Sequence, residues 1–242
     1  MISHEHRCLF VHIPKNAGNS VNRVFGFGWQ DHKDLARYHA ELPSTAFHDY
    51  FKFAVVRNPW DRLFSDYNYQ LKKSRPNDSK LFLFDERGRQ RSFSEWVESA
   101  LGEPERYAPA NWGGEVSPGI HRFSPQVDWI SIDGVRRLDF VARLESLDQD
   151  FRVICRHLGM KRRRLPRRNG RFHFHYSRYY DSPTRERVAR YYARDIATFR
   201  YEFEERTFSL AFSNWFSGRF PARVNVTDLG ADLATPPSEL NP

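Results

Sequence analysis

The chain has 242 residues, of which 40% are hydrophobic and 16% aromatic, so one domain of this length can bury a core without disulfides or metals. Its net charge of +8 and isoelectric point near 9.6 predict an anionic partner, such as a nucleotide, an acidic glycan, nucleic acid or a membrane surface. No apolar run approaches membrane-spanning length, so we expect no transmembrane segment, although a basic face can still contact a membrane peripherally.

The cysteine usage and the first residues predict where the protein resides. Cys8 and Cys155 are the only cysteines, one at a predicted strand and one on the apolar face of a predicted helix, so we expect reduced thiols. The opening residues, MISHEHR, contain no apolar signal region. These features predict a cytoplasmic protein.

In the first half of the chain, hydrophobic periodicity predicts two strands that are each followed by a helix. The predicted ranges are strand 8–13, helix 19–25, strand 51–56 and helix 59–73. Asn58 is a favourable N-cap and Pro59 a favourable first helical residue. We expect residues 26–50 to be loop with some helix and residues 74–91 to be a polar surface insertion.

The second half predicts further helices and a pair of strands. The predicted ranges are a helix beginning after Ser92, strands 127–132 and 138–142 around a turn at 133–134, and helices 147–158 and 183–199. Capping boxes are predicted at Ser92 with Glu95 and at Ser146 with Gln149, and Gly159 is the expected stop of helix 147–158. Two long loops are expected, one at 102–122 and a strongly basic one at 161–171.

The order of these elements predicts the fold class and the domain organisation. Strands that alternate with helices indicate an α/β fold with a central parallel sheet and helices on both faces. We expect one domain over residues 1–217 and a largely disordered tail over residues 218–242, where Pro and Asp recur and no Lys or Arg follows Arg223.

The first predicted strand runs into a loop that carries groups suited to an anion. Residues 9–20 read LFVHIPKNAGNS, in which Gly18 permits close backbone approach, Ser20 offers a hydroxyl and Lys15 supplies a mobile cation. The free N–H groups and dipole at the following helix N-terminus favour an anion there. The Walker A pattern is absent, and an ordinary turn with a surface lysine is the alternative interpretation.

The second predicted strand, FKFAVV, ends at Arg57 and is followed by NPWDRLFSDY. A P-loop kinase usually holds Mg²⁺ with a carboxylate near such a strand end, whereas Arg57 can grip an oxyanion through two parallel hydrogen bonds. Ser65, two turns into the helix, can share the same phosphate, and Arg62 is expected to pair with Asp66 or another acid. Two such cradles predict a ligand with phosphates at two separated points and argue against metal-dependent phosphoryl transfer.

The two segments resemble a known family. HIPKNAGNS and FAVVRNPWDRLFSDY are similar to the nucleotide-binding signatures of sulfotransferases that use 3′-phosphoadenosine 5′-phosphosulfate (PAPS), nearest to the branch of carbohydrate sulfotransferases and their bacterial relatives. The resemblance covers roughly residues 7–203 and includes SPQVDWI, DFVARLESLDQDFRVICRHLG, and FHFHYSRYYD followed by YYARDIATFRYEF. Asn16 and Asn19 stand where the family usually has threonines, so no hydroxyl is available at those two positions.

The resemblance implies a P-loop-NTPase-like three-layer fold and a sulfuryl transfer from PAPS to a hydroxyl group, with a glycan or glycolipid as the acceptor and no metal. The 5′-phosphosulfate would be held by Lys15, Asn16, Ala17, Gly18, Asn19 and Ser20. Lys15 would lie near the bridging oxygen and neutralise charge on the leaving phosphate. Arg57 and Ser65 would hold the 3′-phosphate.

Several histidines are candidates for the general base or for other roles. His39, in RYHAEL, is the first choice, because relatives of this branch often carry a histidine between the two signatures; His48 and His121 are its rivals. His12 alternates with buried neighbours and is expected to be structural. His173 and His175 suggest a metal pair, but no third ligand with suitable spacing accompanies them.

Three alternatives remain at this point. A P-loop nucleotide kinase shares the broad fold class, although the Walker lysine position is missing and Arg57 stands at the metal-ligand position. A non-enzymatic nucleic-acid-binding protein is the second, built on the basic loop 161–171, where no reading motif is present. Phenol, lipid-linked sugar and tyrosine acceptors are open within the sulfotransferase interpretation, and Arg143 either faces the cleft or pairs with Glu145 or another acid.

Overall fold

The structure is a computed structural model that describes residues 1–27, 32–73, 83–104, 116–161, 165 and 174–205. Residues Met1–Glu204 form one compact unit, which contains the elements described below. The predicted disordered tail at 218–242 lies outside the described residues, as do most of the basic loop 161–171 and part of the loop 102–122.

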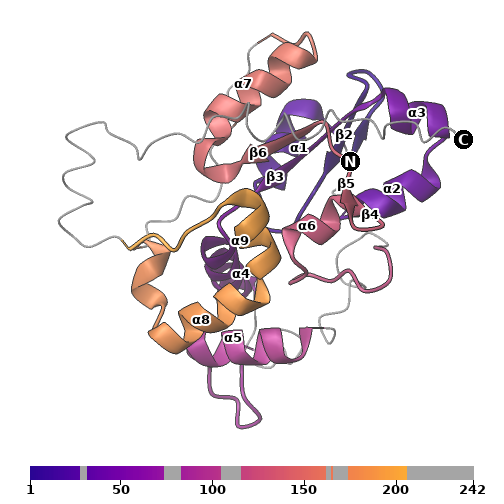
Figure 1. Ribbon diagram of the computed structural model, residues 1–242. Coiled ribbons are helices and arrows are strands. Elements are labelled where there is room, and N and C mark those ends of the chain that lie inside the picture. The colour runs from indigo at the N-terminus through magenta and orange to yellow at the C-terminus, as the bar shows by residue number, and fades with distance from the viewer. Residues whose placement is uncertain (28–31, 74–82, 105–115, 162–164, 166–173, 206–242) are drawn as a thin grey trace, which may run out of the picture. The chain divides into compact units, whose positions relative to one another are not determined.

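A four-stranded sheet forms the centre of this unit, in the order β1-β2-β3-β6 (Figure 1). Its strands are β1 (Ile2–Ser3), β2 (Cys8–Val11), β3 (Phe51–Val56) and β6 (Phe140–Arg143). The last three are parallel, and β1 pairs antiparallel with β2 at the edge. The predicted α/β fold with a central, mostly parallel sheet is thereby confirmed.

Helices cover both faces of the sheet, because alternate side chains of each strand point to opposite sides. On one side, Phe10, Phe53 and Val55 pack in a core with α1 (Gly18–Phe25) and α7 (Leu147–His157). On the other side, the core holds Leu9 and Val56 together with residues of the elements α2 (Leu35–Glu41), α3 (Ser44–Asp49), α6 (Gln126–Trp129) and α9 (Ala193–Phe199). The result is a three-layer arrangement.

A third core fixes the long helix that follows β3. The helices α4 (Pro59–Lys73), α5 (Phe93–Gly102) and α8 (Ser182–Tyr191) pack together around fully buried Trp96. Tyr67 lies edge-on to the Phe93 ring, with 5.3 Å between the ring centroids. This aromatic packing fixes α4 as it leaves the carboxyl end of β3, where the second predicted anion cradle begins.

Both cysteines are free thiols buried in the core between the sheet and α1 with α7. Cys8 opens β2, and Cys155 lies on α7. Burial raises the pKa of the Cys8 thiol to about 12. The thiol therefore stays protonated and unreactive under ordinary conditions.

Several local predictions are confirmed. α4 has the predicted bounds, and the Asn58 side chain accepts from the Trp60 N–H as an N-cap does. Ser92 and Glu95 form the predicted capping box at α5. Gly159 follows α7 with a left-handed φ of 64°, which confirms it as the helix stop.

Three other local predictions are wrong. Ser146 does not cap α7, because a 3-10 turn (Leu144–Ser146) precedes the helix and the Ser146 hydroxyl donates to Asp150. Within the expected surface insertion, Leu83 is completely buried in the core of α4, α5 and α8. The predicted helix 183–199 divides at Tyr192 into α8 and α9.

The predicted strand at 127–132 is also partly wrong. Its first residues form α6, and only β4 (Ser131–Ile132) is extended. β4 pairs with β5 (Val135–Arg136) in a hairpin, and its turn residues Asp133 and Gly134 have φ of 50° and 76°, as the predicted turn requires. No helix in the described part of the chain has the length and apolar character needed to cross a membrane.

Candidate functional site

The carboxyl ends of β2 and β3 bring the two predicted cradles together. β2 and β3 are adjacent and parallel, so the loop after β2 and the residue after β3 emerge at the same edge of the sheet. There the Arg57 guanidinium donates to the Lys15 carbonyl at 3.2 Å. Two residues that are 42 positions apart in the sequence are therefore in direct contact, as expected if the two cradles bind one ligand.

The backbone of the first loop is held in an unusual conformation. Lys15 and Ala17 have φ of 70° and 59°, and neither is glycine. Such left-handed residues cost roughly 1–3 kcal/mol each and cluster at functional sites. Within the described chain, the N–H groups of Ala17, Gly18 and Asn19 make no hydrogen bond, so they are available to an anion at the start of α1.

Gly18 is required here because its backbone passes directly against His12. A Cβ at residue 18 would lie 1.7 Å from the His12 Nε2 atom. His12 is buried, follows β2 and stacks on His32 with 4.1 Å between the ring centroids. Burial lowers the pKa of His12 well below its ordinary value, so the ring is neutral at physiological pH. The expected structural role of His12 agrees with this packing.

Gln126 is the centre of a buried hydrogen-bond network that ties the two loops together. Its Oε1 accepts from Asn16 Nδ2 at 2.7 Å and from the Arg57 N–H at 2.9 Å. Its Nε2 donates to the Arg57 carbonyl and to Asp195, each within 3.1 Å. The Asn16 amide also donates to the Val55 carbonyl. Asn16 is completely buried, so its side chain positions the loop rather than reaching outward.

Arg57 keeps part of its hydrogen-bonding capacity free. Its Nε donates to Asp61 at 2.8 Å, which fixes the guanidinium along α4. Its NH2 group has no partner among the described residues. Ser65 lies one turn beyond Asp61 on the same helix, half-buried, and its hydroxyl makes no hydrogen bond within the described chain. An arginine donor and a free hydroxyl on one side of α4 suit a phosphate.

The Lys15 amine extends toward α4. Its Nζ lies 3.9 Å from the centroid of the Tyr69 ring. Burial, together with the cations Arg122, Arg57 and Lys72, lowers the pKa of Lys15 to about 8, although the Asp66 carboxylate acts in the opposite direction. Lys15 is therefore still mostly protonated at neutral pH, in a setting that favours added negative charge.

Arg62 and Asp66 do not pair as predicted. The buried Arg62 guanidinium donates to three carbonyls, those of Pro14, Arg122 and Ser124, at 2.9–3.3 Å. Asp66 instead accepts two hydrogen bonds from Arg122 in a buried ion pair. Arg62 thereby fastens the segment 122–124 to the first loop.

Arg143, at the end of β6, pairs through its guanidinium with no acid side chain among the described residues. The guanidinium donates to the Phe199 carbonyl and lies 4.9 Å from the centroid of the Tyr201 ring. Glu145 accepts from the Asn58 N–H at 2.6 Å and from the Tyr201 hydroxyl at 3.2 Å. These contacts connect the end of β6 to the start of α4.

The structure does not bring His39 to the two cradles. His39 is exposed on α2. Its ring lies edge-on to the Phe47 ring, with 4.7 Å between the ring centroids. Phe47 contacts the beginning of β3, where its carbonyl accepts from Lys52 Nζ. Arg57 follows the other end of that strand, about 16 Å away at the rise of an extended chain. The first choice of general base is thus a surface residue in this structure.

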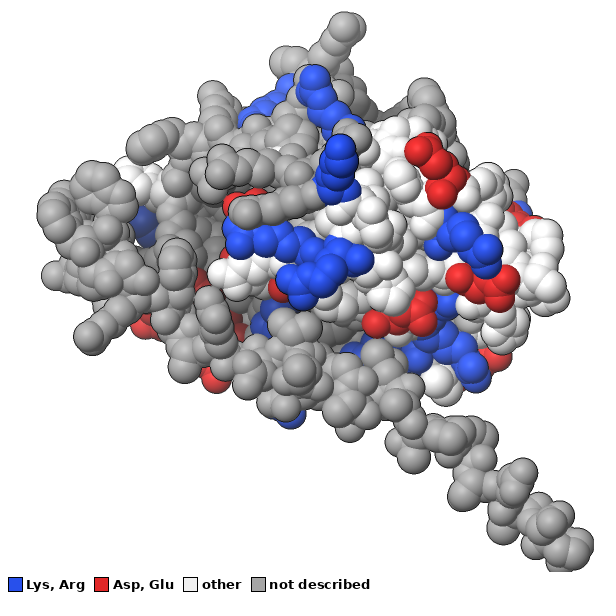
Figure 2. Space-filling model, turned by 90° about the horizontal axis from the view of Figure 1, so that it is seen from above, with Lys and Arg blue, Asp and Glu red and all other residues white. Residues whose placement is uncertain are grey.

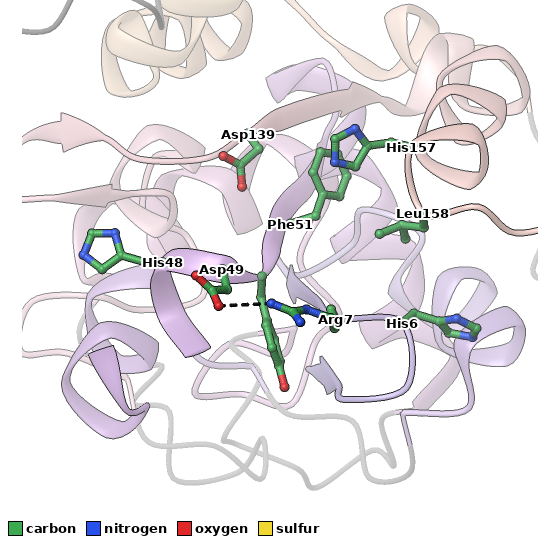
Figure 3. Close-up of a pocket in the computed structure, with 9 residues that line it drawn as sticks. His6, Arg7, His48, Asp49, Phe51, Asp139, His157 and Leu158 are labelled. Carbon is green, nitrogen blue, oxygen red and sulfur yellow. Dashed lines mark hydrogen bonds and ion pairs between the residues drawn. The ribbon is translucent and has the colours of Figure 1, made fainter. Parts of the chain in front are cut away.

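His48 lies at the opposite edge of the sheet. It lines a hollow of about 390 Å³ beside the first residue of β3, Phe51 (Figure 3). In this hollow Arg7 and Asp49 form an ion pair of 3.0 Å, and His157 stacks on Phe51 with 4.0 Å between centroids. The hollow faces away from the strand ends that carry the cradles, so His48 is not placed for chemistry at Lys15.

His121 is the rival that lies beside the first loop, because the next residue belongs to the segment fastened by Arg62. Its Nδ1 accepts from the Phe123 N–H at 3.2 Å. In the neutral ring the proton is then on Nε2, so that nitrogen can donate but not accept. Of the suspected metal pair, His175 accepts from the Ser177 N–H, and His173 lies outside the described residues. No cluster of three potential metal ligands occurs in the described part of the chain.

The sequence reasoning missed the residues that support the loops. Gln126, Asp195, Arg122 and Tyr69 come from segments that the predicted elements do not place together. Gln126 and Asp195 stand in SPQVDWI and YYARDIATF, two segments that carry the family resemblance but no pattern that predicts a hydrogen bond between them. A buried glutamine just before an apolar run is the one local signal that could have indicated the network.

Comparison with known proteins identifies the family to which these residues belong. A family model described as "Sulfotransferase family" matches residues 1–202. The comparison with curated proteins found no match, and the comparison with solved structures found none either. The matched range includes both cradles, the Gln126 network and every strand of the central sheet.

Proposed function

Because the chain belongs to the sulfotransferase family, we propose that it transfers the sulfuryl group of PAPS to a hydroxyl acceptor and that this acceptor is a carbohydrate. The observation that carries the proposal is the hydrogen bond from Arg57 to the Lys15 carbonyl, which joins two anion cradles at one edge of the sheet. A donor with phosphates at both ends of its ribose requires two such cradles. The carbohydrate acceptor is supported by the likeness of the two signatures to carbohydrate sulfotransferases.

The described residues suit such a donor. The N–H groups of Ala17, Gly18 and Asn19 at the start of α1 make no hydrogen bond within the described chain, which suits the 5′-phosphosulfate. The free NH2 group of Arg57 and the Ser65 hydroxyl suit the 3′-phosphate. PAPS supplies an activated sulfuryl group, so the protein needs mainly to orient the reactants and balance charge.

Lys15 performs the charge balance in this proposal. As sulfuryl transfer proceeds, negative charge grows on the leaving phosphate, and a nearby ammonium group stabilises it. Burial lowers the pKa of Lys15 to about 8, and an approaching phosphate raises it again. The ammonium form is therefore favoured when the donor is bound.

Nucleotide discrimination tests the proposal. We expect 3′,5′-adenosine bisphosphate to raise the melting temperature of the protein and 5′-AMP to raise it much less, because only the former engages Arg57 and Ser65. Arg57→Ala should lower the affinity for the bisphosphate about ten- to a hundredfold by calorimetry, the loss of one charge-assisted contact. The same variant should leave the weak affinity for 5′-AMP nearly unchanged.

Arg152→Ala is the matched control, because Arg152 is exposed on α7, which lies on the sheet face rather than at its carboxyl edge. It should bind the bisphosphate as the wild type does. Equal affinity of the wild type for the two nucleotides, or an unchanged affinity in Arg57→Ala, would contradict the proposed 3′-phosphate site. Magnesium-dependent ATP hydrolysis would instead favour a nucleotide kinase.

A further inference from the structure

The Lys15 amine has an aromatic neighbour to which the motifs assign no role. Tyr69 lies one turn beyond Ser65 on α4, and Lys15 Nζ is 3.9 Å from the centroid of its ring. A cation within about 6 Å of a ring centroid is attracted by the negative face of the ring. Tyr69 is also 39% exposed, which is unusual for a large aromatic side chain on a helix whose other aromatics are buried.

The nearby carboxylate does not compete for the amine. Asp66 lies one turn before Tyr69 on α4, but both of its oxygens accept from Arg122. Arg122 is held in place because its carbonyl and those of Pro14 and Ser124 all accept from Arg62. Lys15 makes no ion pair with a carboxylate in the described part of the chain.

The same arrangement places a second cation near the ring. The Arg122 guanidinium carbon lies 5.9 Å from the Tyr69 ring centroid. The charged and titratable groups around Lys15 are therefore Asp66, Arg122, Arg57, Lys72 and His12, in addition to the Tyr69 hydroxyl. Among them only Asp66 is an anion, and both of its carboxylate oxygens accept hydrogen bonds from Arg122. Asp66 still attracts the ammonium through space, but the ring face of Tyr69 is the attractive group that the ammonium contacts directly.

We infer that Tyr69 is the positioning residue of Lys15: its ring face holds the ammonium group at the carboxyl edge of the sheet while Arg122 keeps Asp66 from capturing it. The ring binds the ammonium without neutralising it. The amine therefore stays charged and can move to a phosphate, whereas an ion pair with Asp66 would have to be broken first. This inference rests on the proposed function only for the identity of that phosphate.

The titration of Lys15 tests the inference without any substrate. The chain has seven lysines, and reductive methylation with a ¹³C label gives each a methyl signal in nuclear magnetic resonance. The Lys15 signal is the one that disappears in Lys15→Arg. In the wild type we expect a midpoint near pH 8, as burial dictates.

Two substitutions at residue 69 separate the ring face from the hydroxyl. Tyr69→Leu keeps apolar bulk but removes the ring, so the Lys15 midpoint should fall by roughly half a pH unit or more. Tyr69→Phe keeps the ring face and should titrate like the wild type. Tyr179→Leu is the matched control, because Tyr179 is equally exposed at 39% and stacks on Phe64 rather than on a lysine.

The outcomes separate the inference from the proposed function. A wild-type midpoint in Tyr69→Leu would overturn the inference, and so would a lowered midpoint in Tyr69→Phe, since the hydroxyl would then hold the amine. Failure of the wild type to bind 3′,5′-adenosine bisphosphate would overturn the proposed function but leave the titration informative. If both hold, the alkaline limb of the transfer rate should move to lower pH in Tyr69→Leu and return in Tyr69→Phe.

Discussion

At the scale of single residues, His12 shows how one buried side chain shapes the first loop. Its ring fills the space beside Gly18, where any Cβ would collide with it. Because the ring is neutral when folded, its protonation opposes the folded state. The loop geometry is therefore linked to the titration of a histidine that makes no proposed contact with substrate.

This linkage predicts acid sensitivity. The pKa of His12 is lowered by burial from an ordinary value of 6.5, so below pH 6.5 the unfolded chain binds a proton that the folded chain does not. Folding stability should fall as pH drops, by about 1.4 kcal/mol at pH 5.5 relative to pH 7.5 from this residue alone. Urea unfolding of wild type and His12→Gln at both pH values measures it, since the variant should lack that part of the loss.

Thr45→Ala is the control, because Thr45 is exposed on α3 and removes no ionisable group, so it should show the pH dependence of the wild type. Burial raises the pKa values of Asp150 and Asp195, which acts in the opposite direction, but both carboxyls are present in every variant and cancel in the comparison. An identical pH dependence in wild type and His12→Gln would contradict the prediction.

The sequence predicts the place of a candidate site residue when that residue directly follows a strand. That Lys15 and Arg57 lie together was predictable, because residues that follow buried strands of a parallel sheet must emerge at one known edge. The general base was not, because His39 and His48 lie on helices whose position depends on tertiary packing against Phe47 and Phe51. Sequence proximity to the two signatures gave no information about which edge they occupy.

At the scale of elements, Gln126 joins the loop after β2, the end of β3 and α9. Replacing it with leucine would leave the Arg57 N–H and carbonyl without their partners. Each unpaired buried polar group costs roughly 1–3 kcal/mol, so we expect Gln126→Leu to lose about 2 kcal/mol or more by urea unfolding. Bisphosphate affinity should fall with it, because Arg57 loses its anchor.

Gln149→Leu serves as the comparison, since Gln149 is exposed on α7 and most surface substitutions change stability by less than about 0.5 kcal/mol. If Gln126→Leu were as stable as Gln149→Leu, the network would not hold the two loops. A stable Gln126→Leu with normal nucleotide binding would also rule out its role in placing Arg57.

Elements with local signals were predictable, and elements stabilised from afar were not. α4 and α5 carry their own caps in Asn58 and Ser92, next to apolar residues at helical spacing. α6 reads as a strand because the segment 127–132, VDWISI, is short and rich in β-branched and aromatic residues. It is helical because Asp195, about 70 residues later, accepts from the N–H groups of Gln126 and Val127 at its start.

At the scale of the whole molecule, basic side chains gather on one face, with acidic ones interspersed toward one side of it (Figure 2). The chain as a whole carries a net charge of +8. Long-range attraction of an anionic donor or acceptor falls as salt screens it. This charge suits acidic ligands, and in the proposed site Lys15 and Arg57 would determine where one binds.

The compact unit predicts that the end of the chain is dispensable. All strands of the central sheet, the three cores and both cradles lie within Met1–Glu204. A chain ended after residue 217 should therefore keep its melting temperature within about 2 °C and bind 3′,5′-adenosine bisphosphate as before. Scanning calorimetry and titration calorimetry measure the two quantities. Loss of either would mean that residues 218–242 contribute to the fold or the site.

The two sequestered thiols make this protein convenient for spectroscopy. Cys8 and Cys155 lie in the interior, and maleimide dyes react only with accessible thiolates. A single cysteine introduced on the surface, for instance at Asn19 beside the first loop, would then be the sole position to take up a fluorophore. Donor binding could be followed in real time without first removing a native sulfhydryl.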